Sequence, residues 1–195
     1  MEKITQEELN VILVNHKLWL DKKGGGIKAN LIGINLSKTD LSNADLTDAD
    51  LTNADLTDAD LSNADLRGSN LIRANFSNAI LISANLSNAN LSYADLSNAN
   101  LIKAILRHAI LKHTNLSNAN LSYANLIDAN LSYANLKGAD LINTDARDAN
   151  LNEADLSTAN LKGTKLDGAL LRGTNISNTN QTNSCGRGVN VAPLK

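Results

Sequence analysis

The chain has very few of the residues on which an ordinary globular core or a cysteine-based metal site depends. Of its 195 residues only 3% are aromatic, and there is one proline and one cysteine, Cys185. A single cysteine excludes an internal disulfide and a zinc site built on several thiolates, and it suits a reducing cytosol. The net charge of -2 gives no strong bulk attraction to nucleic acid.

Long apolar runs are also missing from the sequence. The N-terminal stretch is interrupted by Glu7, Glu8, Asn10 and Asn15, so it lacks the continuous apolar core of an export signal. No run approaches the roughly 20 apolar residues that a membrane-spanning helix needs. We therefore expect a soluble, cytoplasmic protein without membrane contact.

A five-residue repeat dominates what is present. From Leu31 to Ile176 an apolar residue recurs at every fifth position, and 27 of these 30 residues are leucine. The residue two places earlier is small, and it is alanine in 23 of the 30 repeats. The unit is Ala-(Asn/Asp)-Leu-(Ser/Thr)-X, and it fills residues 29–178.

Neither regular secondary structure accommodates a period of five. On an α-helix a step of five residues turns by about 140°, so the leucines would scatter around the cylinder. On a continuous strand an odd period would place successive leucines on opposite faces. A short extended Ala-X-Leu piece followed by a turn meets both constraints, and Asn, Asp, Ser and Gly favour turns. The pattern predicts a solenoid with alanine and leucine inside.

The unit resembles the A(D/N)LXX pattern of the pentapeptide-repeat family, over 150 of the 195 residues and without a change of register. The resemblance implies an all-β solenoid, specifically a right-handed quadrilateral β-helix with four pentapeptides in each coil. Residues 29–178 would then make about seven and a half coils. The core should be dry and filled, so we expect neither an internal ligand cavity nor a cofactor.

Both ends of such a solenoid require covering, because they expose unpaired backbone and apolar edges. Residues 1–28 are expected to form an N-terminal cap with a helix over 5–22. Thr5 and Glu8 form a capping-box pattern at its start, and Gly24 to Gly26 end it. Within the helix Trp19 is interpreted as a lid on the first leucine layer. Apolar-face residues recur at helical spacing, namely Leu9, Ile12, Leu13, His16, Trp19 and Leu20.

The C-terminal segment, 179–195, lacks periodicity and is rich in polar residues and glycine. We predict a partly disordered tail there. A poorly covered last coil would then allow a homodimer through the C-terminal end of the solenoid.

No catalytic or metal-binding set is evident. His108 and His113 lie one repeat apart without a Cys or Glu partner, and two histidines alone do not make a metal site. Together with His16 they are interpreted as solvated surface residues. The carboxylates lie along a convex rod, whereas general acid–base catalysis needs a desolvated cleft. We expect a protein that is not an enzyme.

Function is expected at the outward positions, where the middle of the rod departs from the repeat. Several positions there carry isoleucine or tyrosine, and three basic residues (Lys103, Arg107 and Lys112) lie between Asp95 and Asp128 without an acid. Exposed apolar residues indicate a surface that binds a protein partner, here unidentified. They also simply stabilise exposed strands in many proteins. The candidate partner-binding patch is Ile80, Ile82, Tyr93, Ile102, Ile105, Arg107, Ile110, His113, Ile127 and Tyr133.

A second outward feature is an acidic band at residues 40–65, which contain no basic residue. Some members of the family that this chain resembles confer quinolone resistance as acidic rods, which mimic duplex DNA and bind DNA gyrase. Aspartate is equally a favoured turn residue.

The leading hypothesis is thus a protein–protein interaction or scaffold module that does not bind nucleic acid directly. The alternatives are a gyrase-binding DNA mimic and a purely structural domain. The band comprises Asp40, Asp45, Asp48, Asp50, Asp55, Asp58, Asp60 and Asp65.

Overall fold

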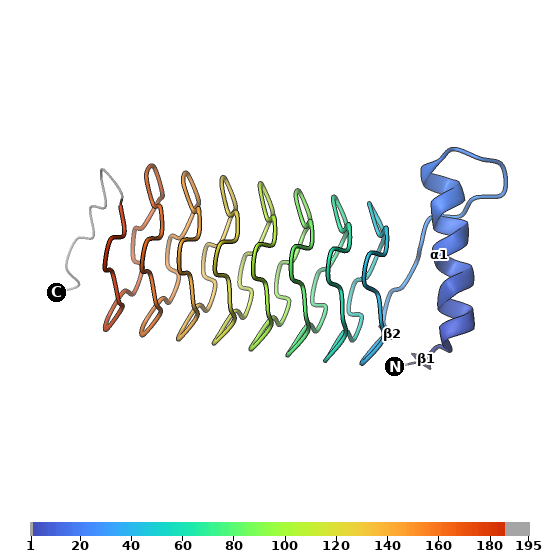
Figure 1. Cartoon of the computed structure of the whole chain (residues 1–195), viewed down its shortest axis with the longest axis horizontal. Helices are drawn as coiled ribbons and strands as arrows, with labels where there is room; N and C mark the ends of the chain where they lie inside the picture. The colour runs from blue at the N-terminus through green and yellow to red at the C-terminus, as the bar shows by residue number, and fades with distance from the viewer. Residues whose placement is uncertain (1, 186–195) are drawn as a thin grey trace.

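The computed structural model describes residues 2–185, which form a straight rod of stacked coils with one helix across its N-terminal end (Figure 1). Strand β1 (Glu2–Lys3) pairs in parallel with β2 (Ile34–Asn35), and helix α1 (Gln6–Leu20) lies between them in the sequence. The rest of the rod is held by isolated parallel bridges between residues 20 apart, such as Asp60 with Ile80.

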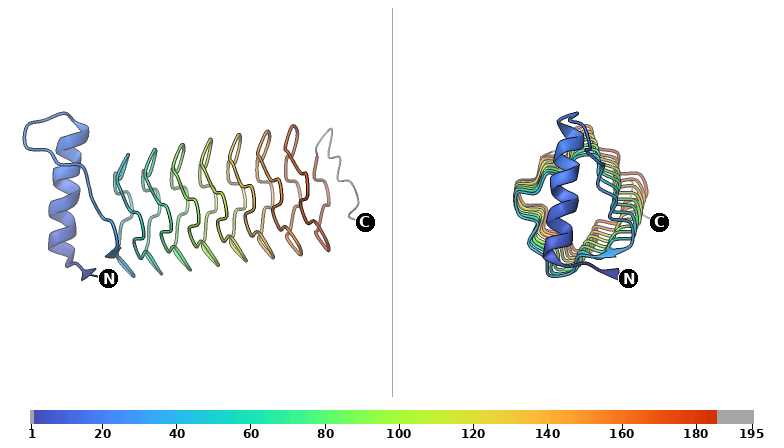
Figure 2. Two further views of the ribbon diagram at one scale, coloured as in Figure 1. Left: turned by 180° about the vertical axis from the view of Figure 1, so that it is seen from behind. Right: turned by 90° about the vertical axis from the view of Figure 1, so that its right-hand side faces the viewer.

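Backbone hydrogen bonds define the coil. Leu51 N–H donates to the Asn70 carbonyl at 2.8 Å, and Asn53 N–H donates to the Ile72 carbonyl at 2.9 Å. Within the unit, Ala54 N–H donates back to the Leu51 carbonyl and closes a four-residue turn. The third turn residue has a positive φ, 57° at Asn53, which excludes a type I turn. Each unit turns the chain by one side, and the coils superimpose along the rod axis (Figure 2). The right-handed quadrilateral β-helix expected from the sequence is confirmed.

The Asn or Asp before each leucine caps the following turn. Asp60 Oδ1, for example, accepts a hydrogen bond from Ser62 N–H at 2.8 Å. This bond pairs the one N–H of the unit that the backbone leaves unsatisfied, so a regular unit buries no orphan donor. We call this side-chain contact the turn cap.

The core consists of four columns of leucines, and alanines fill the space beside them. These leucines are almost all below 3% exposed, and Phe76 substitutes for one of them at 0%. Where threonine replaces the inward alanine, its hydroxyl finds a backbone acceptor. Thr114 Oγ1 donates to the Leu91 carbonyl at 2.8 Å, and Thr144 Oγ1 donates to the Leu121 carbonyl at 2.7 Å. These buried threonine hydroxyls are therefore satisfied.

Helix α1 forms the N-terminal cap. Glu8 N–H donates to Thr5 Oγ1 at 3.2 Å, and Thr5 N–H donates to the Glu8 carboxylate at 2.8 Å, which confirms the capping box. Leu9 is fully buried against the first leucine layer. After the helix the backbone passes so close to α1 that a Cβ on Gly26 would lie 2.2 Å from Trp19 N. Only glycine fits this crossing.

Two expectations about the N-terminal cap were wrong. His16 is fully buried rather than solvated, and its Nδ1 accepts a hydrogen bond from Ala29 N–H at 3.1 Å. Trp19 stays 36% exposed and stacks on His16, with ring centroids 5.6 Å apart. Leu9 and His16, rather than Trp19, therefore cover the first layer. Helical spacing placed His16 on the inward face, but the sequence contained no sign of its acceptor role.

At the other end the coil continues past residue 178. Leu161 N–H donates to the Asn180 carbonyl at 2.7 Å, and Lys165 pairs with Cys185 in a parallel bridge. The segment 179–185 is thus part of the solenoid and not of a disordered tail. The remainder of the predicted tail, 186–195, lies outside the described residues.

Candidate functional site

The four sides of the rod differ in their outward residues. We number the sides by the inward leucines of one coil, with equivalents every 20 residues: side 1 at Leu91, side 2 at Leu96, side 3 at Leu101 and side 4 at Leu106. On side 2 every turn cap is Asn or Asp. Hydrogen bonds from side-chain amides also join neighbouring coils there. Asn115 Nδ2, for example, donates to Asp95 Oδ1 at 2.9 Å. The departures from the repeat lie on the other three sides.

A stack of rings runs along the corner between sides 1 and 2. The Tyr93 and His113 ring centroids are 4.8 Å apart at an interplanar angle of 4°, and those of His113 and Tyr133 are 5.0 Å apart at 10°. The Arg73 guanidinium covers the other face of Tyr93, 5.9 Å from its centroid. We call Tyr93, His113 and Tyr133 the aromatic ladder. Arg73 was missed in the sequence, although its spacing of 20 from Tyr93 was the available signal.

The ladder residues adopt a backbone conformation that suits other residue types better. Their φ values are 62°, 57° and 61°, in the left-handed region. Most equivalent positions hold Asn, Asp or Gly, which tolerate this region. For a bulky residue it costs about 1–2 kcal/mol, and each stacked ring pair returns about 0.5–1.5 kcal/mol. The stack thus roughly offsets the strain, and the two tyrosines remain 55% exposed.

The predicted patch is divided among three consecutive sides. Side 1 carries Ile110 together with the ladder at its corner. Side 4 carries Ile105, Arg107 and Ile127, and side 3 carries the isoleucines at 80, 82 and 102. The structure therefore brings the aromatic residues and Ile110 together on one side. It leaves the isoleucines of side 3 remote from them around the coil.

Isoleucine at positions 80, 105 and 110 also removes turn caps. Within residues 2–185, the N–H groups of Ile82, Arg107 and Lys112 have no hydrogen-bond acceptor. The Arg107 and Lys112 side chains are exposed on the two corners that bound side 1. Lys112 was recognised as basic from the sequence, but the unpaired N–H of its turn is evident only from the hydrogen bonds of the structure.

Most aspartates of the acidic band act as turn caps. Asp50 and Asp60 accept hydrogen bonds from the N–H groups two residues later, as do the other four in this position. Only Asp48 and Asp58 occupy the third turn position and point outward, with φ of 59° and 57°. The band is therefore part of the regular structure of the repeat.

The coil and the cap helix also bring basic groups to this band. Lys17 Nζ of α1 lies 3.6 Å from an Asp45 oxygen, and Arg67 NH2 lies 2.6 Å from Asp65. Partial burial acts to raise the pKa of Asp65, but hydrogen bonds from Arg67 and Thr47 and the charge of Arg67 together lower the pKa. The band therefore carries less net negative charge than its sequence suggests.

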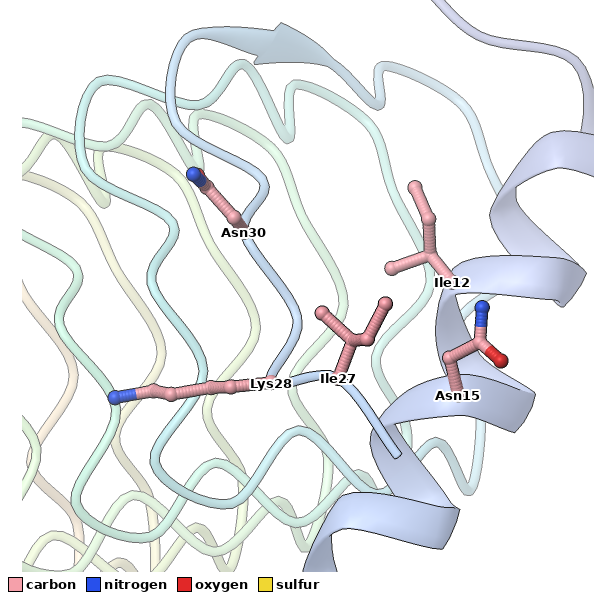
Figure 3. Close-up of a pocket in the computed structure, with 5 residues that line it drawn as sticks. All are labelled: Ile12, Asn15, Ile27, Lys28 and Asn30. Carbon is pink, nitrogen blue, oxygen red and sulfur yellow. The ribbon is translucent and has the colours of Figure 1, made fainter. Parts of the chain in front are cut away.

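An open pocket lies between α1 and the first coil, lined by Ile12, Asn15, Ile27, Lys28 and Asn30 (Figure 3). Two of its five residues are apolar, and it gathers no pair of titratable groups suited to proton transfer. Among residues 2–185 no cluster of His, Cys, Asp or Glu could hold a metal ion. In the same range no helix has the length and apolar character needed to cross a membrane.

Comparison with known proteins identifies the repeat. The family described as Pentapeptide repeats matches in 8 copies across residues 29–68, 59–92, 69–107, 109–145, 124–163 and 154–184. No curated protein sequence matches the chain. Solved structures do match. HetL, a pentapeptide repeat protein involved in heterocyst differentiation regulation in the cyanobacterium Nostoc sp. strain PCC 7120, is 34% identical with a TM-score of 0.58. The match covers 80% of this chain and 75% of HetL.

A second solved structure is QnrB1, a plasmid-mediated fluoroquinolone resistance protein. It is 19% identical with a TM-score of 0.50, and the match covers 83% of this chain and 92% of QnrB1. At this identity the likeness concerns the fold alone. The family match over the rod, the 20-residue coil and the turn caps together show that the chain belongs to the pentapeptide repeat family.

Proposed function

We propose that this protein is a non-enzymatic binding module that presents side 1 and its aromatic ladder to a protein partner. The observation that supports this most is the ladder, which keeps exposed rings in a backbone conformation that favours asparagine or glycine. Strain of this kind often accompanies function. Ile110, 39% exposed on the same side, adds apolar area next to the rings.

The geometry of the ladder favours a protein over a base or a sugar as the partner. Bases and sugars bind by lying on a free aromatic face. Here the faces between Tyr93 and Tyr133 cover each other through His113, and Arg73 covers the outer face of Tyr93. Among residues 2–185 only the outer face of Tyr133 has neither a ring nor a guanidinium over it. The stack offers ring edges and phenol hydroxyls, and tyrosine with arginine is typical of protein interface centres.

A double replacement, Tyr93→Ser with Tyr133→Ser, tests this proposal. Serine occupies the same turn position at Ser83, so the fold should persist. Affinity capture from the native cell should recover a partner with the unaltered protein and lose it with the variant. Tyr123→Ser is the matched control, because Tyr123 is 58% exposed on another corner and stacks on no described ring. Equal capture by all three proteins would contradict the proposal.

The relatives support binding but do not name the partner. HetL is involved in regulating differentiation, a role that fits a binding protein. A gyrase-directed DNA mimic is the alternative and is treated below with the charge of the whole rod. We also propose a cytoplasmic location, which the lone cysteine supports, and a homodimer through the C-terminal end of the solenoid.

A further inference from the structure

The turn caps are so regular that their interruptions are informative. Each Asn or Asp between residues 30 and 180 that precedes an inward residue of the rod accepts a hydrogen bond from the N–H two residues later. The cap is lost only where another residue type stands. Those positions are Ile80, Ile105, Ile110, Lys165 and Leu170.

The losses at Ile105 and Ile110 are consecutive, and both coincide with positive charge. Ile105 and Ile110 precede the turns that contain Arg107 and Lys112, at the two corners of side 1. Both turn N–H groups lack an acceptor within residues 2–185, and each belongs to a residue with an exposed basic side chain. An unpaired N–H and a cation on one residue together favour an oxyanion.

The rod itself shows that an oxygen from elsewhere can occupy the capping position. Leu170 cannot cap the next turn, and Arg172 N–H instead donates to Asn152 Oδ1 of the preceding coil at 2.9 Å. In the coil that precedes Arg107 and Lys112, the positions equivalent to Asn152 are occupied by Ser87 and Ser92. Their hydroxyls donate to Asn85 and Asn90 at 2.7 Å, so they are engaged in their own turns.

We propose that the turns at Arg107 and Lys112 bind two carboxylates of an acidic protein segment lying across side 1. Each carboxylate accepts from one turn N–H, as an aspartate cap does elsewhere in the rod, and pairs with the basic side chain of that turn. Ile110 lies between the two turns and contacts the aliphatic part of the segment. This inference rests on the proposed function and specifies the chemistry of the partner.

The charge distribution favours an acidic protein segment over nucleic acid. A polynucleotide engages a long line of cations along its phosphates. Arg67 and Arg147 lie in the same column as Arg107, two coils away on either side, but they are paired with Asp65 and Asp145. The basic residues between Asp95 and Asp128 lie within one coil, at Lys103, Arg107 and Lys112. The carboxylate of Asp128 lies 3.7 Å from His108 Nδ1, in the turn of Arg107, but it accepts from neither the Arg107 N–H nor the Lys112 N–H. A short segment with two carboxylates matches the extent of this site.

The probe is a short capped peptide of alternating glutamate and alanine, titrated into the full chain labelled with nitrogen-15. The amide signals of Arg107 and Lys112 should move as the peptide binds. The amide signals of Ile102 and Ile127 should not move, because their N–H groups already donate to Asn100 and Asn125 at 3.2 and 3.1 Å. Binding should weaken with added salt. A glutamine–alanine peptide of equal length should give no shift, and equal shifts with it would overturn the proposal.

A double variant, Ile105→Asn with Ile110→Asn, restores both turn caps with the residue that the repeat uses elsewhere, so the chain should fold. Its affinity for the glutamate peptide should fall by about tenfold or more, since hydrogen bonds to charged groups contribute at least that much. Ile80→Asn is the matched control and should leave the affinity unchanged, because the turn it caps, at Ile82, has no basic side chain.

Unchanged affinity in the double variant would overturn the proposal. So would inorganic phosphate that shifts the Arg107 and Lys112 amides at a lower concentration than the peptide does, since this would assign the site to phosphate. Peptide binding is measured without the native partner. Its failure therefore leaves the result of the Tyr93 and Tyr133 capture experiment, and with it the proposed function, unaffected.

Discussion

At the scale of single residues, the rod depends on side chains that complete the hydrogen bonding of the backbone. The hydroxyls of Thr114 and Thr144 donate hydrogen bonds to leucine carbonyls in the core, and the turn caps accept hydrogen bonds from N–H groups at the corners. The loss of a turn cap lowers the free energy of unfolding more when the turn is buried, because water cannot then replace the missing acceptor. Arg107 and Lys112 are exposed, whereas Ser122 is only 7% exposed.

Replacement of Asn120 by alanine should therefore destabilise the rod. Asn120 Oδ1 accepts from Ser122 N–H at 3.0 Å, and without it this buried donor has no partner. We expect the free energy of unfolding to fall by about 1–3 kcal/mol, measured by urea denaturation. Asn120→Asp keeps the accepting oxygen and is the control. A loss of equal size in both variants would show that the cap is not the cause.

At the scale of elements, one buried histidine joins α1 to the rod. His16 Nδ1 must be unprotonated to accept the Ala29 N–H. Its Nε2 is buried near the Thr47 backbone without a regular hydrogen bond. Burial lowers the pKa of His16 from the ordinary 6.5, although the Thr47 carbonyl, Asp45 and Asp48 act to raise it and Lys28 acts with burial. The docked helix thus disfavours protonation.

Docking of α1 should accordingly weaken in acid. Because the pKa of His16 is lowered in the folded state, the undocked state binds the proton more readily, so stability is lost as pH falls below about 6.5. Trp19 is the only tryptophan and stacks on His16, so its emission wavelength reports the helix. We expect an acid-induced shift to longer wavelength that His16→Gln abolishes. The same shift in the variant would exclude His16 as the titrating group.

At the scale of the whole molecule, charge is arranged along the rod rather than concentrated. The net charge is only -2, the aspartates of residues 40–65 mostly cap turns, and Lys17 and Arg67 pair with Asp45 and Asp65. The coil of Arg107 and Lys112 adds a basic zone at mid-length. A duplex mimic requires a continuous negative surface, and this rod does not provide one.

We therefore expect no inhibition in a DNA gyrase supercoiling assay with the purified chain. The matched variant Asp48→Asn with Asp58→Asn removes the two aspartates that point outward from the turns. If the unaltered chain inhibited supercoiling and this variant did not, the DNA-mimic alternative would replace the binding module as the function.

The sequence alone determined that the chain is a solenoid, because a period of five fits neither a continuous helix nor a continuous strand, whereas the four sides and the right hand were implied by the resemblance to the family. The spacing of Leu51, Leu56 and Leu61 demands a turn in every unit, and leucine burial along the axis follows. The capping box of α1 was equally local, since Thr5 and Glu8 are three residues apart. The column of Tyr93, His113 and Tyr133 could be predicted once 20 residues were assigned to a coil.

The tertiary structure decided what depends on neighbours distant in the sequence. Burial of His16 required the chain to return over α1 and present the Ala29 N–H. The salt bridge between Lys17 and Asp45 likewise joins α1 to the rod, a placement that no local pattern encodes. Spacing fixes which residues point inward because side-chain direction is a local property of the backbone. Contacts between residues of different coils or elements form only when the chain has wound into the solenoid and α1 has packed against it.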